Sequence, residues 1–309
     1  MRSMASSSAS SRGIAAIVGV GPNLGLSIAR KFAHEGYTVA ILARDLGRLS
    51  RFAEEIAREE KAQVFAIRID CSDSRSVREA FEGVLSLGFV EVLVYNAYYH
   101  PLQNTSANTN HWNPTSFHDL RLDSFQKSLA VSSVGAFHCA QQVLPGMVER
   151  GKGTILFTGC SASLNGIAGY SELCKYNIIH SLLIYFNYLL LLFKYFHENT
   201  GCGKFALRAL SQCLAREFQP QGVHVAHVII DGLVGPPRGQ TTSSQERIVA
   251  SSYGELSSSN SGVVVGSGIV DGTIMDPDTL AQTYWHLHIQ DRNAWTQEMD
   301  LRSSCARFF

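Results

Sequence analysis

Short apolar runs alternate with longer amphipathic segments along most of the chain, beginning at Gly13. The runs are rich in Val, Ile, Leu and Ala, and Gly or polar residues bound them, which is typical of strands buried on both faces of a sheet. They predict strands over residues 14–20, 38–43, 63–69, 90–95, 153–158 and 223–230.

Between these runs, apolar residues recur at the spacing of one helix face. In the first such segment Leu24, Ile28 and Phe32 share a face, and Gly36 is the kind of residue that ends a helix. The predicted helices cover residues 24–36, 46–60, 74–85, 125–150 and 205–218. The repeated strand–helix–strand order predicts an α/β, three-layer Rossmann fold, in which a doubly wound parallel sheet carries helices on both faces.

Three segments depart from this pattern in a chain that we otherwise interpret as a single domain over residues 13–309. Residues 1–12 are rich in Ser and lack the apolar core of a secretory signal, so we interpret them as a disordered leader, with organelle targeting left open. Residues 236–272 are rich in Ser and Gly and predict a flexible loop. Residues 175–201 form an apolar insert.

The overall composition argues against several classes of protein. Among 309 residues, 26 Lys and Arg balance 26 Asp and Glu, so no nucleic-acid partner is predicted. The seven cysteines are scattered, odd in number and never spaced as Cys-x-x-Cys, which favours reduced thiols and a cytoplasmic location. No spacing of His or Cys indicates a metal site. Association into a homo-oligomer is left open.

A glycine-rich turn joins the first predicted strand to the first predicted helix. Glycines at such a turn let the backbone approach a pyrophosphate, and the helix N-terminus offers free N–H groups to it. A glycine motif alone is a weak signal, but here a strand precedes it and a helix follows it, as dinucleotide binding requires. The predicted contacts are Gly19, Gly21, Asn23, Leu24 and Gly25.

The end of the second predicted strand favours NADP(H) over NAD(H). Ala43 stands where an NAD-dependent enzyme usually places an acid for the ribose 2′-hydroxyl, and Arg44 can pair with a 2′-phosphate. Asp45 offers the alternative of binding the ribose itself. Asp70 and Cys71, at the end of the third strand, are placed to meet the adenine.

Several motifs between residues 13 and 235 together resemble the short-chain dehydrogenase/reductase family. The glycine turn is similar to the family's Thr-Gly-x-x-x-Gly-x-Gly, and residues 204–217 resemble the helix that carries its catalytic lysine. The resemblance implies an NAD(P)-dependent oxidoreductase that transfers a hydride between NADP(H) and a small carbonyl or alcohol substrate. The further cofactor contacts that it implies are Asn96, Ala97, Lys204, Asp231 and Gly232.

The same resemblance implies a catalytic Asn, Ser, Tyr and Lys. In that chemistry Tyr protonates the carbonyl oxygen, Lys lowers the pKa of the Tyr, and Ser polarises the carbonyl. Lys204 matches the lysine, Ser161 is assigned to the serine, and Ser132 occupies the position of the asparagine. The tyrosine position, four before Lys204, is Thr200, and no Tyr-x-x-x-Lys occurs in the chain. Tyr170 is the candidate substitute acid, with a place in the wall of the substrate pocket as the alternative.

The insert at residues 175–201 interrupts the match to the family. Without it, Cys174 would join Cys202 and the sequence would fit the family without a gap. The insert is dominated by residues whose codons are rich in A and T, namely Phe, Tyr, Ile, Leu, Asn and Lys. We therefore interpret it as translated intron or an error in the gene model. Its apolar part, residues 178–193, is shorter than the about 20 residues that cross a bilayer. A buried extra helix is therefore favoured over a membrane anchor.

Two functions are consistent with these features. The first is an oxidoreductase with Lys204 and Ser161 in its site. The alternative is a catalytically weak or inactive NADP(H)-binding sensor or scaffold, which the missing tyrosine and asparagine favour.

Overall fold

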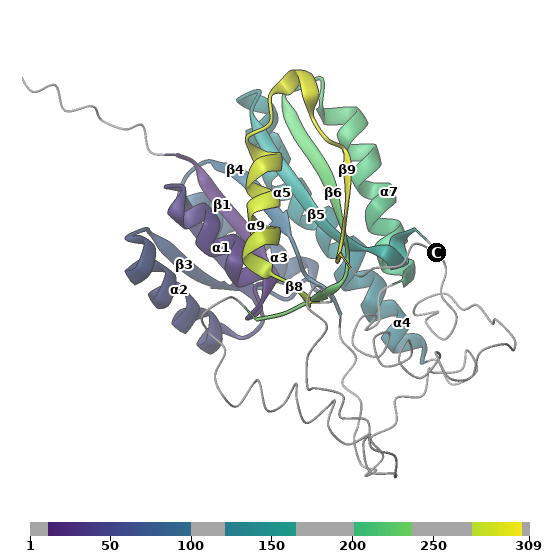
Figure 1. The fold of residues 1–309 in the computed structure, drawn as a ribbon, viewed down its shortest axis with the longest axis horizontal. Coiled ribbons are helices and arrows are strands. Elements are labelled where there is room, and N and C mark those ends of the chain that lie inside the picture. Colours follow the sequence, from purple (N-terminus) through teal and green to yellow (C-terminus); the bar gives the residue numbers. More distant parts are fainter. Residues whose placement is uncertain (1–11, 100–120, 165–200, 237–273, 305–309) are drawn as a thin grey trace, which may run out of the picture.

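The computed structural model describes residues 12–99, 121–164, 201–236 and 274–304, and it confirms the predicted α/β fold (Figure 1). Seven strands form one parallel sheet in the order β3-β2-β1-β4-β5-β6-β9. They are β1 (Ile14–Val18), β2 (Thr38–Ala43), β3 (Val64–Arg68), β4 (Val90–Tyr95), β5 (Gly153–Cys160), β6 (Val223–Asp231) and β9 (Glu298–Arg302). The strand order reverses between β1 and β4, and the crevice at such a reversal is where open α/β sheets bind ligands.

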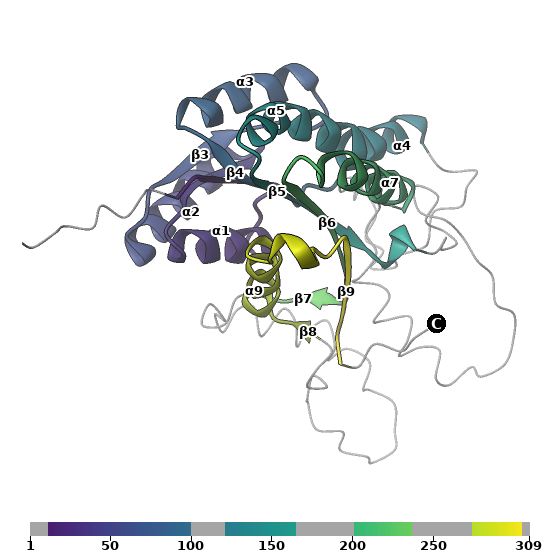
Figure 2. The same cartoon turned by 90° about the horizontal axis from the view of Figure 1, so that it is seen from above.

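Helices cover both faces of this sheet, as Figure 2 shows. One face carries α1 (Leu24–His34), α2 (Leu46–Glu60) and α9 (Pro277–His288). The other face carries α3 (Ser74–Ser86), α4 (Leu122–Leu129), α5 (Gly135–Glu149) and α7 (Gly201–Phe218). The structure is therefore the three-layer arrangement that the alternating pattern predicts.

The core follows from the alternation of side chains along the strands. Ile17 and Ile41 point to one face and pack with residues of α1 and α9. Val18 and Leu42, each one residue further on, point to the other face and pack with residues of α3 and α5. Because both faces are buried, the strands are apolar throughout, which is why the sequence shows continuous runs there.

The predicted elements differ from the observed ones in places. The long helix predicted over residues 125–150 is α4 and α5 joined by a π-helical turn (Ala130–Val134). The helix predicted from residue 205 begins at Gly201. The C-terminal α9 and β9 were not predicted, nor was the short parallel pair of β7 (Leu233–Val234) and β8 (Ile274–Met275).

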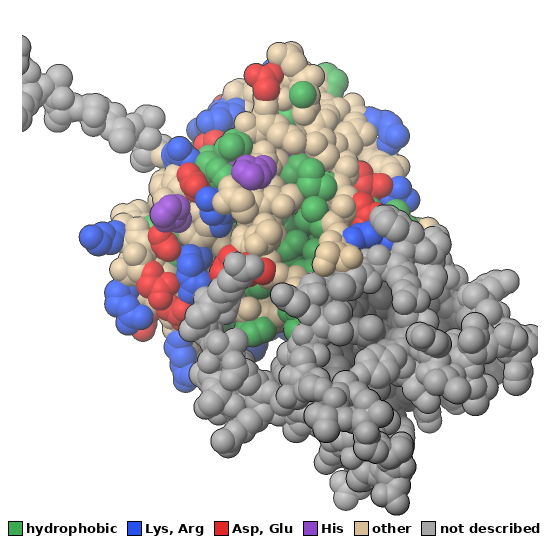
Figure 3. Space-filling view, viewed as in Figure 1, with side chains coloured by type: hydrophobic (Ala, Val, Ile, Leu, Met, Phe, Trp, Pro, Cys, Tyr) green, Lys and Arg blue, Asp and Glu red, His purple; other side chains and the backbone are tan. Residues whose placement is uncertain are grey.

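The leader, except for Arg12, and most of both the insert and the Ser/Gly-rich loop lie outside the described residues. Within the described ranges, none of the helices combines the length and the apolar character that crossing a membrane requires. Acidic and basic side chains are interspersed over the part of the surface that Figure 3 colours, in keeping with the balanced formal charge.

Candidate functional site

The turn between β1 and α1 is closely packed against the end of β4. Gly19 has a φ of +85°, and a Cβ there would lie 2.4 Å from the backbone nitrogen of Ala97. A Cβ on Gly25 would lie 2.9 Å from the carbonyl oxygen of Gly19. Gly21 differs, because a Cβ there would meet no atom of the described part of the chain within 4 Å. Two of the predicted glycines therefore allow tight packing, while the third leaves open space beside the turn.

Two asparagines hold this turn in place. The Nδ2 of Asn96 donates to the carbonyl oxygen of Gly19 at 3.0 Å, and the Nδ2 of Asn23 donates to the carbonyl oxygen of Val234 at 3.2 Å. Asn23 is the N-cap of α1, but its side chain makes no capping hydrogen bond. The N-terminus of α1, from Leu24 on, therefore combines a positive dipole end with the open space at Gly21, and these features fit a pyrophosphate.

Both residues that follow β2, Arg44 and Asp45, are exposed, and Asp45 also caps a helix. Asp45 is the N-cap of α2, and its Oδ1 accepts from the backbone N–H of Arg48 at 3.0 Å. This capping bond is a structural role for Asp45 that the sequence analysis did not consider, although Asp before a helix is a common capping signal. Arg44 is exposed beside the small Ala43, as the interpretation of an NADP(H) site requires.

Asp70 is held rigidly in the loop that follows β3. Its Oδ1 accepts from the backbone N–H and the hydroxyl of Ser72, at 2.9 and 2.6 Å. Burial raises the pKa of Asp70, but the bonds from Ser72 and the positive charges of Arg44 and Arg68 outweigh it and leave the pKa below its usual value. The carboxylate is therefore a fixed acceptor next to Arg44.

Cys71 is nearly buried and packs against the start of α5. A Cβ on Gly135 would lie 2.9 Å from the Cβ of Cys71 and 2.7 Å from the hydroxyl of Tyr95. The hydroxyl of Tyr95 donates to the carbonyl oxygen of Val131, and burial raises its pKa. Cys71 thus lies just after β3, where the adenine is expected, and it packs on Tyr95 and Gly135.

Lys204 lies at the carboxyl end of β5, in the first turns of α7. Its side chain is buried, and Nζ donates to the carbonyl oxygen of Thr158 at 2.6 Å. Burial lowers the pKa of Lys204, and the nearby Cys160 acts in the opposite direction. A buried lysine with a lowered pKa at the carboxyl end of a strand is a candidate component of an active site.

Ser132 and Ser161 approach Lys204 from two other elements. Ser132 is fully buried in the π-helical turn, and its Oγ lies 3.0 Å from where a Cβ on Gly203 would be. Gly203 thus allows Ser132 to lie against α7 next to Lys204. Ser161 opens the 3-10 turn (Ser161–Ser163) directly after β5. Tyr170 and Thr200 lie outside the described residues.

The remaining predicted contacts lie at the carboxyl end of β6. Asp231 forms an ion pair with Arg302 of β9, with Oδ2 3.0 Å from Nη1. This carboxylate is therefore engaged within the sheet, and Gly232 follows it before β7. The predicted site residues that precede β5 in the chain and those that follow it lie at the same edge of the sheet, because the carboxyl ends of parallel strands lie at one edge.

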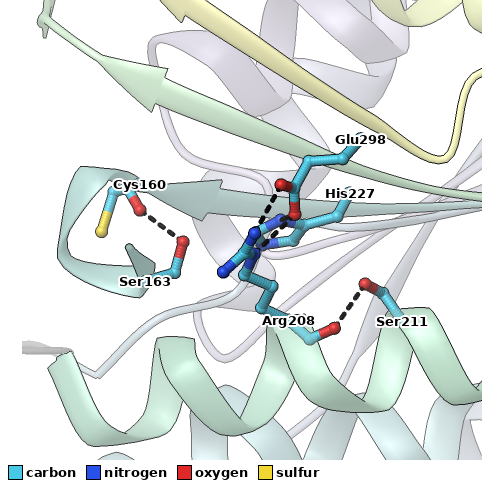
Figure 4. A network of polar contacts seen from close by, with 6 residues as sticks. All are labelled: Cys160, Ser163, Arg208, Ser211, His227 and Glu298. Carbon is cyan, nitrogen blue, oxygen red and sulfur yellow. Dashed lines mark hydrogen bonds and ion pairs between the residues drawn. The ribbon is translucent and has the colours of Figure 1, made fainter. Parts of the chain in front are cut away.

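A group of polar residues that the sequence analysis did not identify lies next to Lys204. His227 of β6 and Arg208 of α7 both contact Glu298 of β9, as Figure 4 shows. No local pattern connects three residues so far apart in the chain, so no sequence signal could have revealed the group. Among the described residues, no cluster of three or more His, Cys or carboxylate side chains has the arrangement of a metal site.

Comparisons with known proteins agree with this fold. The family model described as short chain dehydrogenase matches residues 13–176, so the match ends where the apolar insert begins. A short-chain dehydrogenase/reductase of Armillaria gallica is 26% identical over 227 residues, covering 72% of this chain and 71% of the relative. A 3-dehydrosphinganine reductase of Danio rerio is 24% identical over 214 residues, covering 68% of this chain but 53% of the relative. The chain thus spans about half the length of the zebrafish protein.

Solved structures share the fold along nearly the whole chain. A short-chain dehydrogenase from Rhodopseudomonas palustris has a TM-score of 0.64 at 24% identity and covers 94% of this chain and 98% of its own. An actinorhodin polyketide ketoreductase with NADPH has a TM-score of 0.68 at 19% identity, with coverages of 96% and 98%. At these identities the likeness is one of fold.

Proposed function

Because the chain belongs to the short-chain dehydrogenase family, we propose that this oxidoreductase transfers a hydride between NADP(H) and a small carbonyl or alcohol substrate. The observation that carries the proposal is the turn at Gly19, Gly21 and Gly25, packed on Asn96 and facing the same sheet edge as Lys204. When bound, NADP(H) supplies or takes up the hydride.

The residues of the chain provide binding and charge. The N-terminus of α1 and the open space at Gly21 hold the pyrophosphate, and Arg44 pairs with the 2′-phosphate. Lys204 brings a cation to the carboxyl end of β5, where Ser161 polarises the substrate oxygen. The proton donor is proposed to be Tyr170, the tyrosine that precedes the insert.

The first test is the binding of NADPH and NADH to the full chain, which is monitored by the fluorescence of the reduced cofactor. Gly21→Ala is the sharpest variant, because its methyl group meets no atom of the described residues within 4 Å. We therefore expect the fold to stay intact while the methyl group fills the space for the pyrophosphate. We expect unchanged thermal unfolding and weaker NADPH binding. An unchanged NADPH affinity in this variant would show that the cofactor does not lie at the turn.

A second candidate function is an NADP(H)-binding sensor or scaffold with little hydride transfer. The absence of Tyr-x-x-x-Lys favours it, because Thr200 cannot act as the acid that the family uses. Turnover with a panel of aldehydes and ketones, in the wild type and in Lys204→Met, separates the two. Lys204-dependent turnover supports the oxidoreductase, whereas NADPH binding without turnover supports the sensor.

A further inference from the structure

Three polar side chains from α7, β6 and β9 form a continuous chain of contacts (Figure 4). Arg208 and Glu298 are partly exposed, whereas His227, the member that senses the charge of Lys204, is fully buried. Arg208 follows Lys204 by one helical turn, so both point toward the sheet. Its Nε and Nη2 donate to the two carboxylate oxygens of Glu298 at 2.7 and 2.8 Å. The same carboxylate lies 3.3 Å from Nδ1 of His227, whose side chain has an exposed fraction of 0%.

This arrangement determines which nitrogen of His227 carries the proton. The carboxylate of Glu298 can only accept, so Nδ1 carries the hydrogen and Nε2 presents a lone pair. Burial and the positive charge of Lys204 lower the pKa of His227 to about 4, although Glu298 acts in the opposite direction. The imidazole is therefore neutral at physiological pH.

The lone pair on Nε2 has no hydrogen-bond partner among the residues that the structure describes. Leaving a buried acceptor unpaired is destabilising. Nε2 lies against the backbone of Gly159, where a Cβ would be 2.1 Å away. Gly159 directly follows Thr158, whose carbonyl oxygen accepts the bond from Lys204. The unpaired lone pair and the bond from Lys204 thus involve adjacent residues of β5.

The ammonium group of Lys204 can satisfy this acceptor. It has three N–H donors on a flexible stem, and the bond to Thr158 uses one of them. The charged and titratable groups that face this pair are Arg208 from α7, Glu298 from β9 and Cys160 from β5. Of the donors among them, Arg208 is engaged with Glu298 through two hydrogen bonds.

We propose that His227 is a positioning residue for Lys204, with its Nε2 as the second acceptor for the ammonium group and with Glu298 and Arg208 fixing the imidazole. The inference rests on the proposed function, in which Lys204 serves the active site. A neutral acceptor beside the ammonium offsets part of the desolvation of Lys204 and keeps it charged and in place.

The direct test is the titration of Lys204 in the full chain, without cofactor, by NMR of lysines labelled with ¹³C at Cε. The signal of Lys204 is identified by its absence in Lys204→Arg. In His227→Leu we expect the titration midpoint to fall by about 1 pH unit, since one hydrogen bond to the cation is lost. His227→Gln keeps an acceptor near the position of Nε2, and we expect a midpoint close to that of the wild type.

His224→Leu is the matched control, because His224 is also buried in β6 but its Nε2 contacts the carbonyl oxygen of Thr296 at 2.8 Å. An unchanged midpoint in His227→Leu, or an equal fall in His224→Leu, would overturn the inference. If His227→Leu does not fold, His227→Phe decides, because its ring keeps the flat shape of the imidazole but lacks the lone pair. A midpoint unchanged in that variant also overturns it. Since no cofactor is present, loss of NADPH binding or turnover would refute only the proposed function.

Discussion

The side-chain amide of Asn96 donates a hydrogen bond to the carbonyl oxygen of Gly19, over 3.0 Å. The backbone N–H of Asn96 also donates to the carbonyl oxygen of Val18 at 2.8 Å. Together these bonds join the end of β4 to the turn after β1, so the proposed cofactor site rests on two strands. Its geometry therefore depends on the close approach of the two backbones, which glycine at position 19 permits.

Gly19→Ala is expected to destabilise the protein strongly. The left-handed backbone conformation costs an alanine about 1–2 kcal/mol, and the methyl group would also collide with the backbone of Ala97. Gly36→Ala is the matched control, since Gly36 has a φ of +86° but no atom of the residues that the structure describes lies within 4 Å of its Cβ position. Urea unfolding should show a larger loss for Gly19→Ala than for Gly36→Ala. Equal losses would mean that the packing on Ala97 is unimportant.

Arg44→Ala is expected to weaken NADPH binding by about tenfold or more and to leave NADH binding nearly unchanged. A charged hydrogen bond to a phosphate contributes about 1.5–3 kcal/mol, and only NADPH carries the 2′-phosphate. The ratio of the two dissociation constants is the measurement. Arg51→Ala, which removes an exposed arginine from α2, should keep the wild-type ratio. A parallel loss of both cofactors in Arg44→Ala would contradict the assignment.

His288 is expected to make the protein less stable in mild acid. Its Nε2 lies 2.6 Å from the hydroxyl of Tyr37 and its Nδ1 2.9 Å from Oγ1 of Thr154, and burial lowers its pKa to about 4. Because the unfolded histidine titrates near 6.5, the unfolded state takes up the proton first as the pH falls. The free energy of unfolding should therefore decrease between pH 6.5 and pH 4, by on the order of 2 kcal/mol between pH 7 and pH 5.

Urea unfolding at pH 7 and pH 5 measures this dependence. In His288→Gln the part of the pH dependence that His288 contributes should be absent. The similar contribution of His227, whose pKa is also lowered to about 4, remains. His286→Gln changes an exposed histidine of the same helix and should keep the wild-type dependence. The same pH dependence in His288→Gln as in the wild type would rule out this role.

Removing residues 175–201 is expected to leave a protein that folds and binds NADPH. The deletion joins Cys174 to Cys202, and the family match ends at residue 176. Thermal unfolding and NADPH fluorescence of the shortened chain are the measurements, and sequencing of the transcript is the independent check. A transcript that always encodes this stretch, together with a shortened chain that does not fold, would contradict our interpretation of the insert.

The sequence predicted those features that depend on neighbouring residues. Apolar periodicity identified the strands from β1 to β6 and the helices between them, because both faces of a parallel sheet must be apolar. The glycine turn and Lys204 were identifiable because each belongs to a short motif. Asp45 has a local role that was not predicted, since its carboxylate caps α2, and its contact with the ribose stays a prediction.

Contacts between distant segments could not be predicted in the same way. The register of β9 on β6 pairs His227 with Glu298, and α7 then brings Arg208 to the same carboxylate. β9 contains Glu298, Asp300 and Arg302, which make it too polar for the pattern of a buried strand. Periodicity was thus sufficient to predict the fold class, and the cofactor turn is a prediction from a local motif. The surroundings of Lys204 depend on tertiary packing, because polar groups from strands far apart in the chain come together only when those strands are packed side by side.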